Sequence, residues 1–370
     1  MRTCILVLGV LFLIRCQTPE SSLKRIIIEV EEKQEILQLS TLFDSLHYIP
    51  LETVNSSILE GIDRLCLDSR ENIYILDQEG TNAVLKFDRQ GRFMGKIGYQ
   101  GRGPGEYLEI SDFCIYQDTL VEILDAMQEK RIQYSTDGSF VREYLHCDAG
   151  DGDFLHFGDT LIFYSPCGGY CPNLKICIRD QEYGFFKQNT RELWKKFEYI
   201  HTTGDRIFYS DNYNDTIYHF ADGQLLPWLY IDFDGKNLPA GFQGYEKVAQ
   251  SPYCWNVDNI KVMDRYIYFD FNYKEQTIQA FVDTETDEKY VFRILRNDID
   301  HVPFLIFPKV CTCPEKIVTY LTATMLIESY AYNKRAGEKI SEVFDTLYHS
   351  ISEDSNPVLV FAYLKNKHRI

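Results

Sequence analysis

Residues 62–107 read IDRLCLDSRENIYILDQEGTNAVLKFDRQGRFMGKIGYQGRGPGEY and contain short apolar segments separated by turn residues. The segments are Ile62–Leu67, Asn72–Leu76, Ala83–Asp88 and Phe93–Ile97. Each is too short for an ordinary helix, and Asp, Asn, Ser and Gly fill the gaps between them. An antiparallel meander of four strands in about 45 residues is the repeating unit of a β-propeller.

The next stretch of the chain repeats this pattern. Its expected strands are Phe113–Tyr116, Leu120–Leu124, Arg131–Ser135 and Phe140–Leu145. Asp125 follows Asp77 by 48 residues, and Gly138 follows Gly91 by 47. Weaker copies occur at residues 160–179, 205–223 and 265–284. Five such units end near Ile294, so the remaining residues must supply a sixth blade.

The sixth blade must also close the ring. The segment Tyr48-Ile49-Pro50-Leu51 is predicted to be its outer strand, because proline is tolerated on a strand with one unpaired edge. Residues 304–322 supply its first two strands and residues 357–365 the strand before the outer one. Between them, residues 324–352 show helical periodicity. Strand connectivity predicts that this helical insertion lies on the upper face of the disc, as a lid over the funnel.

The segments NIYILD, GPGEY and YIPLET, with NPVLVFAYLK at the end, resemble the six-bladed β-propeller proteins of Bacteroidetes. Those proteins are mostly predicted lipoproteins and are distantly similar to NHL-repeat and TolB-like propellers. The resemblance covers roughly residues 40–370. It implies an all-β, six-bladed propeller and an envelope location, but the biochemical activity of that family is largely unassigned.

The bulk composition restricts the partners. The formal net charge is −17, so the chain should repel phosphate backbones and anionic head groups. We therefore expect no nucleic-acid partner, and membrane attachment only through an anchor. Aromatic residues make up 14% of the chain, which suits sheets packed face to face. We expect a monomer.

The first 16 residues, MRTCILVLGVLFLIRC, are predicted to be a lipoprotein signal segment with Cys16 as the lipidated residue. The apolar run from Ile5 to Ile14 is too short to span a bilayer as a helix. Arg15 departs from the usual small residue before the cysteine, so an ordinary cleaved signal and a short uncleaved anchor remain alternatives. Residues 17–39 then form a tether and an N-terminal strand, and residues 40–370 the propeller. This predicts an exported outer-membrane lipoprotein facing the periplasm or the cell surface.

Antiparallel connectivity predicts which loops share a face. The turns after the second strand of each blade, and the crossing Gly98–Tyr107 between the first two blades, should lie together around the funnel. By fold analogy this face binds ligands. The predicted ligand-binding residues are Asp77, Arg102, Glu106, Tyr107, Asp125, Arg131, Asp211, Tyr213, Asp270 and Tyr273.

Two of these features have structural alternatives. The glycines at 98, 101, 103 and 105 permit close approach of a ligand, but they also suit a tight crossing between blades. The repeated aspartates commonly cap turns, although carboxylates converging on a funnel could hold Ca²⁺ or activate water. No histidine stands at the matching positions, so no metal site and no cofactor is predicted, with Ca²⁺ as the alternative.

The third blade carries Cys167 and Cys171 in place of the repeated aspartate, and these could form a small disulfide in an oxidising compartment. No sequence motif of a hydrolase triad, zinc protease or nucleotide loop occurs. The leading hypothesis is a binding or scaffolding protein of the cell envelope whose partner is a small ligand, a glycan, a peptide or another protein. The alternative is a lactonase- or lyase-type propeller enzyme that uses funnel carboxylates, with or without a divalent metal.

Overall fold

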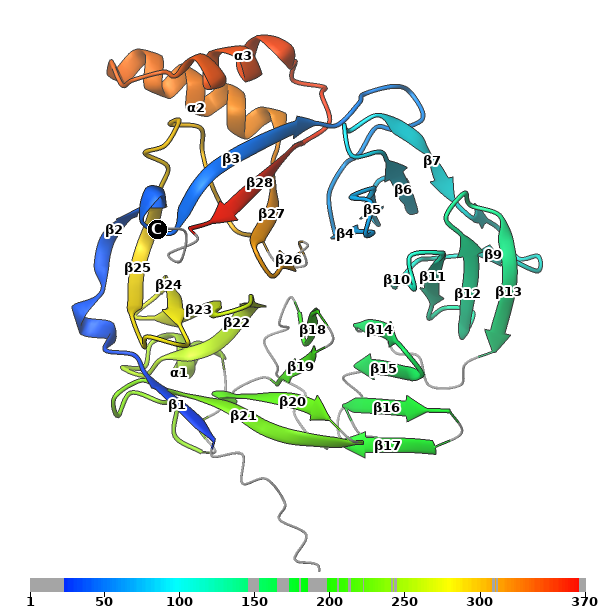
Figure 1. The fold of residues 1–370 in the computed structure, drawn as a ribbon, viewed down its shortest axis with the longest axis horizontal. Helices are drawn as coiled ribbons and strands as arrows, with labels where there is room; N and C mark the ends of the chain where they lie inside the picture. The colour runs from blue at the N-terminus through cyan, green and yellow to red at the C-terminus, as the bar shows by residue number, and fades with distance from the viewer. Residues whose placement is uncertain are drawn as a thin grey trace, which may run out of the picture.

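The strands of the computed structural model are arranged as blades around a central axis, as Figure 1 shows. The structure describes residues 23–145, 153–164, 173–179, 181–185, 198–204, 206–211, 214–221, 223–240, 242, 245–307, 310 and 312–365. Six sheets of four or five strands make up the ring. The protein is a six-bladed β-propeller, as the repeat predicts.

The first three blades are simple four-stranded meanders. Blade 1 contains β4 (Arg64–Leu67), β5 (Ile73–Asp77), β6 (Ala83–Phe87) and β7 (Phe93–Ile97). Blade 2 contains β10 (Asp112–Tyr116), β11 (Leu120–Asp125), β12 (Lys130–Ser135) and β13 (Phe140–Leu145). Blade 3 contains β14 (Phe154–Phe157), β15 (Thr160–Tyr164), β16 (Leu174–Ile178) and β17 (Gln181–Phe185). The strands of blades 1 and 2 lie within two residues of their predicted bounds.

The other three blades include strands from the N-terminal segment. Blade 4 contains β18 (Ile200–Thr203), β19 (Arg206–Ser210), β20 (Thr216–Ala221), β21 (Gln224–Asp232) and β1 (Lys24–Ile27). Blade 5 contains β22 (Trp255–Val262), β23 (Tyr266–Tyr273), β24 (Gln276–Asp283), β25 (Lys289–Arg296) and β2 (Gln34–Gln38). Blade 6 contains β26 (Thr312–Cys313), β27 (Lys316–Leu321), β28 (Val358–Leu364) and β3 (Phe43–Pro50).

Residues 24–50 run along the outer edge of three successive blades. β1 pairs in parallel with β21 and β2 in parallel with β25, with the 3-10 turns Val30–Glu32 (η1) and Leu39–Thr41 (η2) between the strands. β3 then pairs antiparallel with β28, with Ile49 opposite Leu359. The predicted closure of the ring through Tyr48–Leu51 is confirmed. The propeller begins earlier than residue 40, because β1 and β2 cover the edges of blades 4 and 5.

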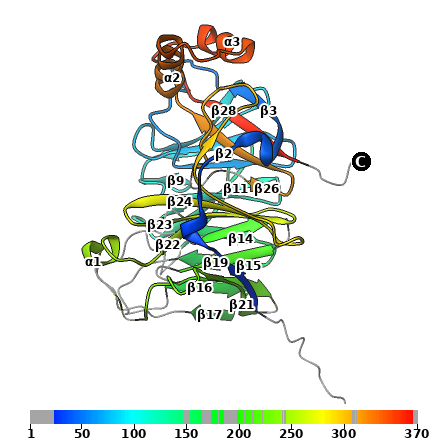
Figure 2. The same ribbon diagram turned by 90° about the vertical axis from the view of Figure 1, so that its left-hand side faces the viewer.

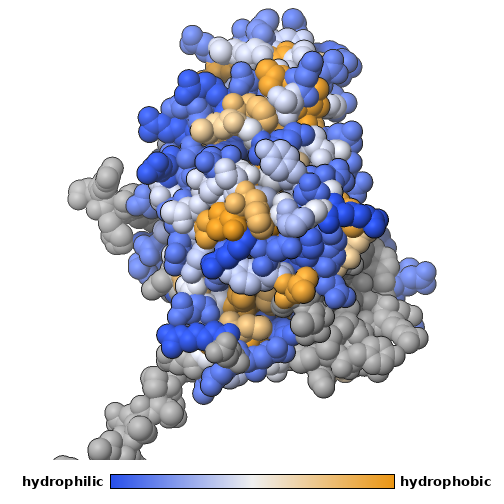
Figure 3. All heavy atoms as spheres, turned by 90° about the vertical axis from the view of Figure 1, so that its right-hand side faces the viewer, coloured by the Kyte–Doolittle hydropathy of each residue, from blue (hydrophilic) through white to orange (hydrophobic). Residues whose placement is uncertain are grey.

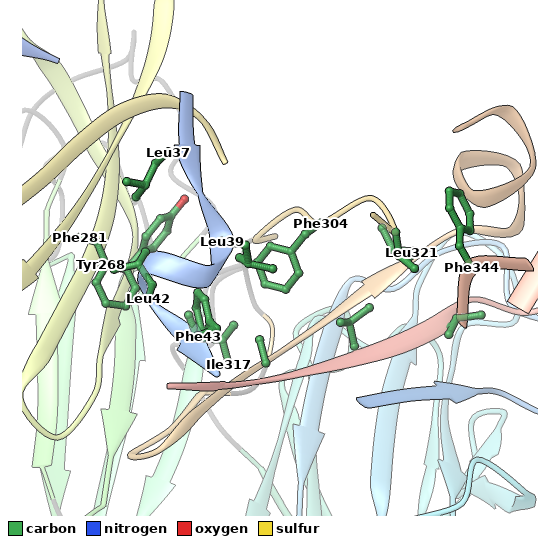
Figure 4. Packing of buried hydrophobic residues seen from close by; sticks show 14 of the residues in the cluster. Leu37, Leu39, Leu42, Phe43, Tyr268, Phe281, Phe304, Ile317, Leu321 and Phe344 are labelled. Atoms are coloured by element: carbon green, nitrogen blue, oxygen red, sulfur yellow. The ribbon is translucent and has the colours of Figure 1, made fainter. Parts of the chain in front are cut away.

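The core lies between the blades. All five residues of β5 and all five of β6 are buried, because each middle strand packs against a neighbouring blade on both of its faces. Each interface between neighbouring blades holds its own apolar cluster. In the cluster between blades 5 and 6, Phe43 of β3 contacts Phe281 and Phe304, with ring centroids 6.1 and 5.7 Å away (Figure 4).

Three α-helices occur in the described part of the chain, and α1 (Tyr245–Ala249) lies in the crossing between blades 4 and 5. The predicted helical insertion of blade 6 is formed by α2 (Ala323–Ala336) and α3 (Glu342–Ser350). Each begins at a hydroxyl N-cap, Thr322 for α2 and Ser341 for α3, whose side chain accepts a backbone N–H of the first turn.

The predicted lid is wrong. Figures 1 and 2 show α2 and α3 at the outer rim beyond β28 and β3, away from the centre of the ring. The physical reason is their packing: Leu326, Tyr330, Phe344 and Leu347 are buried in the apolar cluster between blades 5 and 6. That cluster holds the helices at the rim.

Candidate functional site

Figure 1 shows the first strands of the six blades around the propeller axis. Residues of these strands line a hollow, which we call the central channel. Its volume is about 260 Å³, and its wall takes residues from β4, β10, β14, β18, β22 and β26. Each of these strands is the innermost of its blade. Polar wall residues include Arg64, Glu198, His201 and Lys261.

Two ion pairs connect different blades across the wall of the central channel. Arg64 Nη1 of blade 1 lies 2.5 Å from Asp112 Oδ2 of blade 2. Lys261 Nζ of blade 5 lies 2.7 Å from Oε2 of Glu198, which precedes the first strand of blade 4. The Lys261 side chain is only 2% exposed. Buried charges of this kind persist only when each is paired, so the two cations depend on their carboxylates.

Buried aspartates also join the inner strands directly. The backbone N–H of Phe154, in blade 3, donates to Asp112 Oδ2 at 2.8 Å. The backbone N–H groups of Tyr199 and Ile200 donate to Asp153 in the same way. The second oxygen of Asp112, Oδ1, is buried and has no hydrogen-bond partner within the described residues. A buried acceptor left without a donor costs about 1–3 kcal/mol.

The channel environment shifts the pKa of its ionisable groups. Burial alone would lower the pKa of Arg64, but the Asp112 carboxylate outweighs it and raises that pKa well above the usual value. Burial raises the pKa of the Cys66 thiol, and burial also raises that of Cys114. Both thiols line the channel and are therefore protonated and uncharged at neutral pH.

The predicted turn aspartates are elements of the turns themselves. Asp77 and Asp125 are both completely buried. Asp77 accepts the backbone N–H of Thr81 at 2.9 Å, and Asp125 accepts those of Leu108 and Gln128 at 2.7 and 3.0 Å. Their oxygens are directed to these backbone amides, so the structure places neither carboxylate in the central channel.

The glycine-rich crossing packs against blade 2. It forms the short parallel pair β8 (Tyr99–Gln100) and β9 (Glu106–Tyr107). The Tyr134 hydroxyl donates to Gly105 O at 2.9 Å, and the Gly105 N–H donates to Glu143 at 2.9 Å. Gly105 has a φ of +71°, and a Cβ there would lie 2.5 Å from the Phe140 ring. A glycine is required for this close crossing.

The charged and aromatic residues of the crossing do not converge on the channel. Glu106 accepts the backbone N–H of Gly103 at 2.7 Å, within its own loop. Tyr107 is 2% exposed in the apolar cluster between blades 1 and 2, and burial raises its pKa to about 12. Arg102 is exposed to solvent.

The structure does bring the turns of blades 1 and 2 together with this crossing. Asn82 Nδ2 donates to Leu108 O at 2.9 Å, and the Gln78 side chain donates to Ile110 O at 2.8 Å. With the Asp125–Leu108 contact, these bonds place the two turns and the crossing on one face. Their bonds are made to one another and fix the geometry of the first two blades.

The other predicted residues lie apart. Asp211 is buried, and it adds to the effect of burial in raising the pKa of Tyr209. Arg131 pairs with the completely buried Glu122 at 2.7 Å, inside blade 2. Tyr273 is 2% exposed and donates to Glu31 of the N-terminal segment.

The predicted loop at Asp270 is wrong, because β23 continues through it to Tyr273. The turn of this hairpin is at Lys274 and Glu275, both with positive φ. Blade 5 has longer strands than blades 1 and 2, which displaces its turn relative to the repeat. Tyr213, Cys167 and Cys171 lie outside the described residues.

Sequence reasoning missed the channel residues Arg64, Glu198 and Lys261, and Asp112 as the partner of Arg64. The sequence carries only a weak signal for these residues. Arg64 and Lys261 are charged residues within otherwise apolar strand segments. In the part of the chain that the structure describes, no group of three or more His, Cys, Asp or Glu side chains could hold a metal ion. None of the described helices is long and apolar enough to cross a bilayer.

The family model described as "Domain of unknown function (DUF4934)" matches residues 25–363, and the chain belongs to this family. No match was found among curated proteins. Two solved structures have the same fold. A candidate exported protein of Bacteroides fragilis NCTC 9343 is similar with a TM-score of 0.74 and 19% identity, covering 92% of this chain and 99% of its own. A DUF4221 member of Bacteroides vulgatus ATCC 8482 is similar with a TM-score of 0.51 and 9% identity, covering 88% and 97%.

Proposed function

We propose that this protein is an exported binding protein of the cell envelope that takes a small polar ligand into the central channel. The observation that carries the proposal is the convergence of charged groups from different blades on one hollow. Arg64, Glu198 and Lys261 reach it from separate parts of the chain. A hollow of about 260 Å³ is below the usual 300–1,000 Å³ of drug-sized pockets, so the ligand is small.

The ligand would bind polar side chains of the channel wall that are already held in position by their ion pairs. A ligand amine or hydroxyl can donate to the Glu198 carboxylate, and a ligand acceptor can share the donors of Arg64 or Lys261. Because these groups belong to different blades and are held by ion pairs, they need little rearrangement on binding. An uncharged or zwitterionic molecule suits the balance of cations and carboxylates in the wall.

The test is a thermal-shift screen of the mature protein with amino acids, dipeptides, monosaccharides and uronic acids, followed by calorimetry. Arg64→Lys and Lys261→Met are expected to weaken binding of any hit about tenfold or more, since the first loses the planar guanidinium donors and the second removes a charge. Arg265→Lys is the matched control. The two ion pairs are equally buried. The Arg265 and Asp283 side chains are 13% and 1% exposed, and those of Arg64 and Asp112 are 12% and 1% exposed. Equal binding by Arg64→Lys, Lys261→Met and Arg265→Lys would exclude the channel.

The anchor is part of the same proposal. We propose that Cys16 carries the lipid and that residues 17–23 connect it to β1 at the edge of blade 4. Metabolic labelling with a fatty acid should modify the full-length chain and leave a Cys16→Ser variant unlabelled. Labelling of that variant, or none of the wild type, would contradict the anchor without affecting the channel. Turnover of a channel ligand in the same screen would favour the lyase- or lactonase-type alternative.

A further inference from the structure

A second hollow, separate from the central channel, lies at the rim between blades 5 and 6. Its volume is about 680 Å³. One wall is the end of β25 and the crossing that follows it, residues 294–305, and the other wall is α2 with residues 338–339. Figure 1 shows this crossing between β25 and α2, outside the ring of inner strands. We call this hollow the rim groove.

Helix α2 has one face for the core and another for the rim groove. Leu326 and Tyr330 are buried against the propeller. Met325, Ser329 and Tyr332 line the groove, at the spacing of four and three residues that places side chains on one helical face. The side chain of Tyr332 is 62% exposed, so the flat face of an aromatic ring is available to a ligand.

Hydrogen-bonding groups of both kinds surround that ring. Arg296 and Lys339 are donors, Glu328 and Glu338 are acceptors, and the amide of Asn333 is both. Within the described residues, no hydrogen bond or ion pair of these five side chains occurs. Two cations and two carboxylates give the groove no net formal charge, although the chain as a whole carries −17.

We propose that the rim groove binds a neutral oligosaccharide. Sugar rings present a C–H face that packs on an aromatic ring, and their hydroxyls need donors and acceptors close together. Tyr332 supplies the first requirement, and the mixed charged and amide side chains supply the second. The absence of net charge in the groove fits an uncharged ligand better than an anionic one.

The alternative occupant, an extended peptide, lacks the usual means of binding at this position. Peptides commonly add as a strand to an open sheet edge. Here the edge of β25 beside the groove is already covered by β2, with Leu37 opposite Leu295 and Gln38 opposite Arg296. The groove therefore offers side-chain contacts in place of a backbone ladder.

The experiment is calorimetry of the mature protein with four neutral oligosaccharides as probes: β-1,4-linked glucose, mannose and xylose, and α-1,4-linked glucose. At least one is expected to bind. Tyr332→Ala should weaken that binding about tenfold, the effect of losing one aromatic contact. Tyr332→Phe, which keeps the ring, should retain most of it. The matched control is Tyr99→Ala, since Tyr99 is 72% exposed and lies in the crossing between blades 1 and 2.

Figure 3 views the rim on the side of blades 1 and 2, where apolar side chains are interrupted by hydrophilic ones. Tyr99 does not line the rim groove, so Tyr99→Ala is expected to leave oligosaccharide binding unchanged. Binding by none of the four oligosaccharides would overturn the proposal, as would equal losses in Tyr332→Ala and Tyr99→Ala. Arg64→Lys should not alter oligosaccharide binding, which separates failure of the rim groove from failure of the central channel.

Discussion

Two sets of buried carboxylates differ in what holds them. The turn carboxylates, Asp77 and Asp125, accept backbone amides from nearby turns and from the crossing of blades 1 and 2. The carboxylates paired with the channel cations, Asp112 with Arg64 and Glu198 with Lys261, are on other blades than their partners. The comparison teaches that a residue recurring in each blade of a propeller, such as the turn aspartate, can serve the local structure of the blade. Asp112 and Asp153 also repeat a bond, to a backbone amide of the following blade, whereas the channel cations Arg64 and Lys261 do not recur from blade to blade in the described part of the chain.

The largest expected effect of a single substitution is that of Arg64→Ala. It should lower the free energy of unfolding by about 3–5 kcal/mol, because the Asp112 carboxylate would stay buried without its cation. Urea denaturation measures this change. The double variant Arg64→Met/Asp112→Asn should recover much of the loss, since it removes both charges and keeps an oxygen for the Phe154 N–H.

Arg265→Ala is the matched substitution, because it removes the cation of an equally buried Arg–Asp pair at a turn. Asp283, its partner, also accepts the backbone N–H groups of Glu285 and Thr286, at 3.0 and 3.2 Å. Asp283 keeps these two donors after the guanidinium is removed, whereas Asp112 keeps only the Phe154 N–H among the described residues, so the loss should be smaller than for Arg64→Ala. Equal losses would show that the channel pair is held no differently from a pair at a turn.

The next effect is that of Asp125→Ala. It should cost about 2 kcal/mol in urea denaturation, because the amides of Leu108 and Gln128 lose their acceptor. Asp125→Asn keeps an oxygen and should cost less. Binding of a channel ligand should be the same for both variants and the wild type. A loss of binding without a loss of stability would instead place the turn carboxylates at the ligand.

The smallest expected effect is the contribution of Asp283 to the pH dependence of the unfolding free energy. Burial alone would raise the pKa of Asp283, but the Arg265 guanidinium and the two turn amides outweigh it and lower the pKa to about 2. A carboxyl with a lowered pKa stabilises the fold above its unfolded pKa of about 3.9, and this contribution is lost as pH falls toward 2. The unfolding free energy of Asp283→Asn should therefore change less between pH 4 and pH 2. Parallel pH profiles for the variant and the wild type would contradict this assignment.

Much of the fold could be predicted because its signals are local. The apolar segments of residues 62–97 are short and bounded by turn residues, and the strands β4 to β7 follow them closely. Closure by β3 could be predicted because one strand was missing from the sixth blade. The helices α2 and α3 could be predicted from their periodicity, but not their position, which depends on apolar contacts with blades 5 and 6.

The parts that could not be predicted depend on assembled blades. The parallel pairing of β1 with β21 joins segments about two hundred residues apart in the chain, and no local pattern encodes it. Likewise, Glu198 and Lys261 are 63 residues apart and meet only in the closed ring. The turn aspartates stood out in the sequence because they recur, and recurrence favoured them as site residues over single, non-repeated charges.

The central claim, that a ligand occupies the channel, is tested most directly by ligand protection of a channel thiol. Cys66 lines the channel and is half-buried, while Cys177 is half-buried on β16 and is not part of the channel wall. At alkaline pH, where part of the Cys66 thiol is ionised, and with the screened ligand at ten times its Kd, alkylation of Cys66 measured by mass spectrometry should slow about tenfold, and that of Cys177 should not change. An unchanged rate at Cys66, or equal protection of Cys177, would contradict the account.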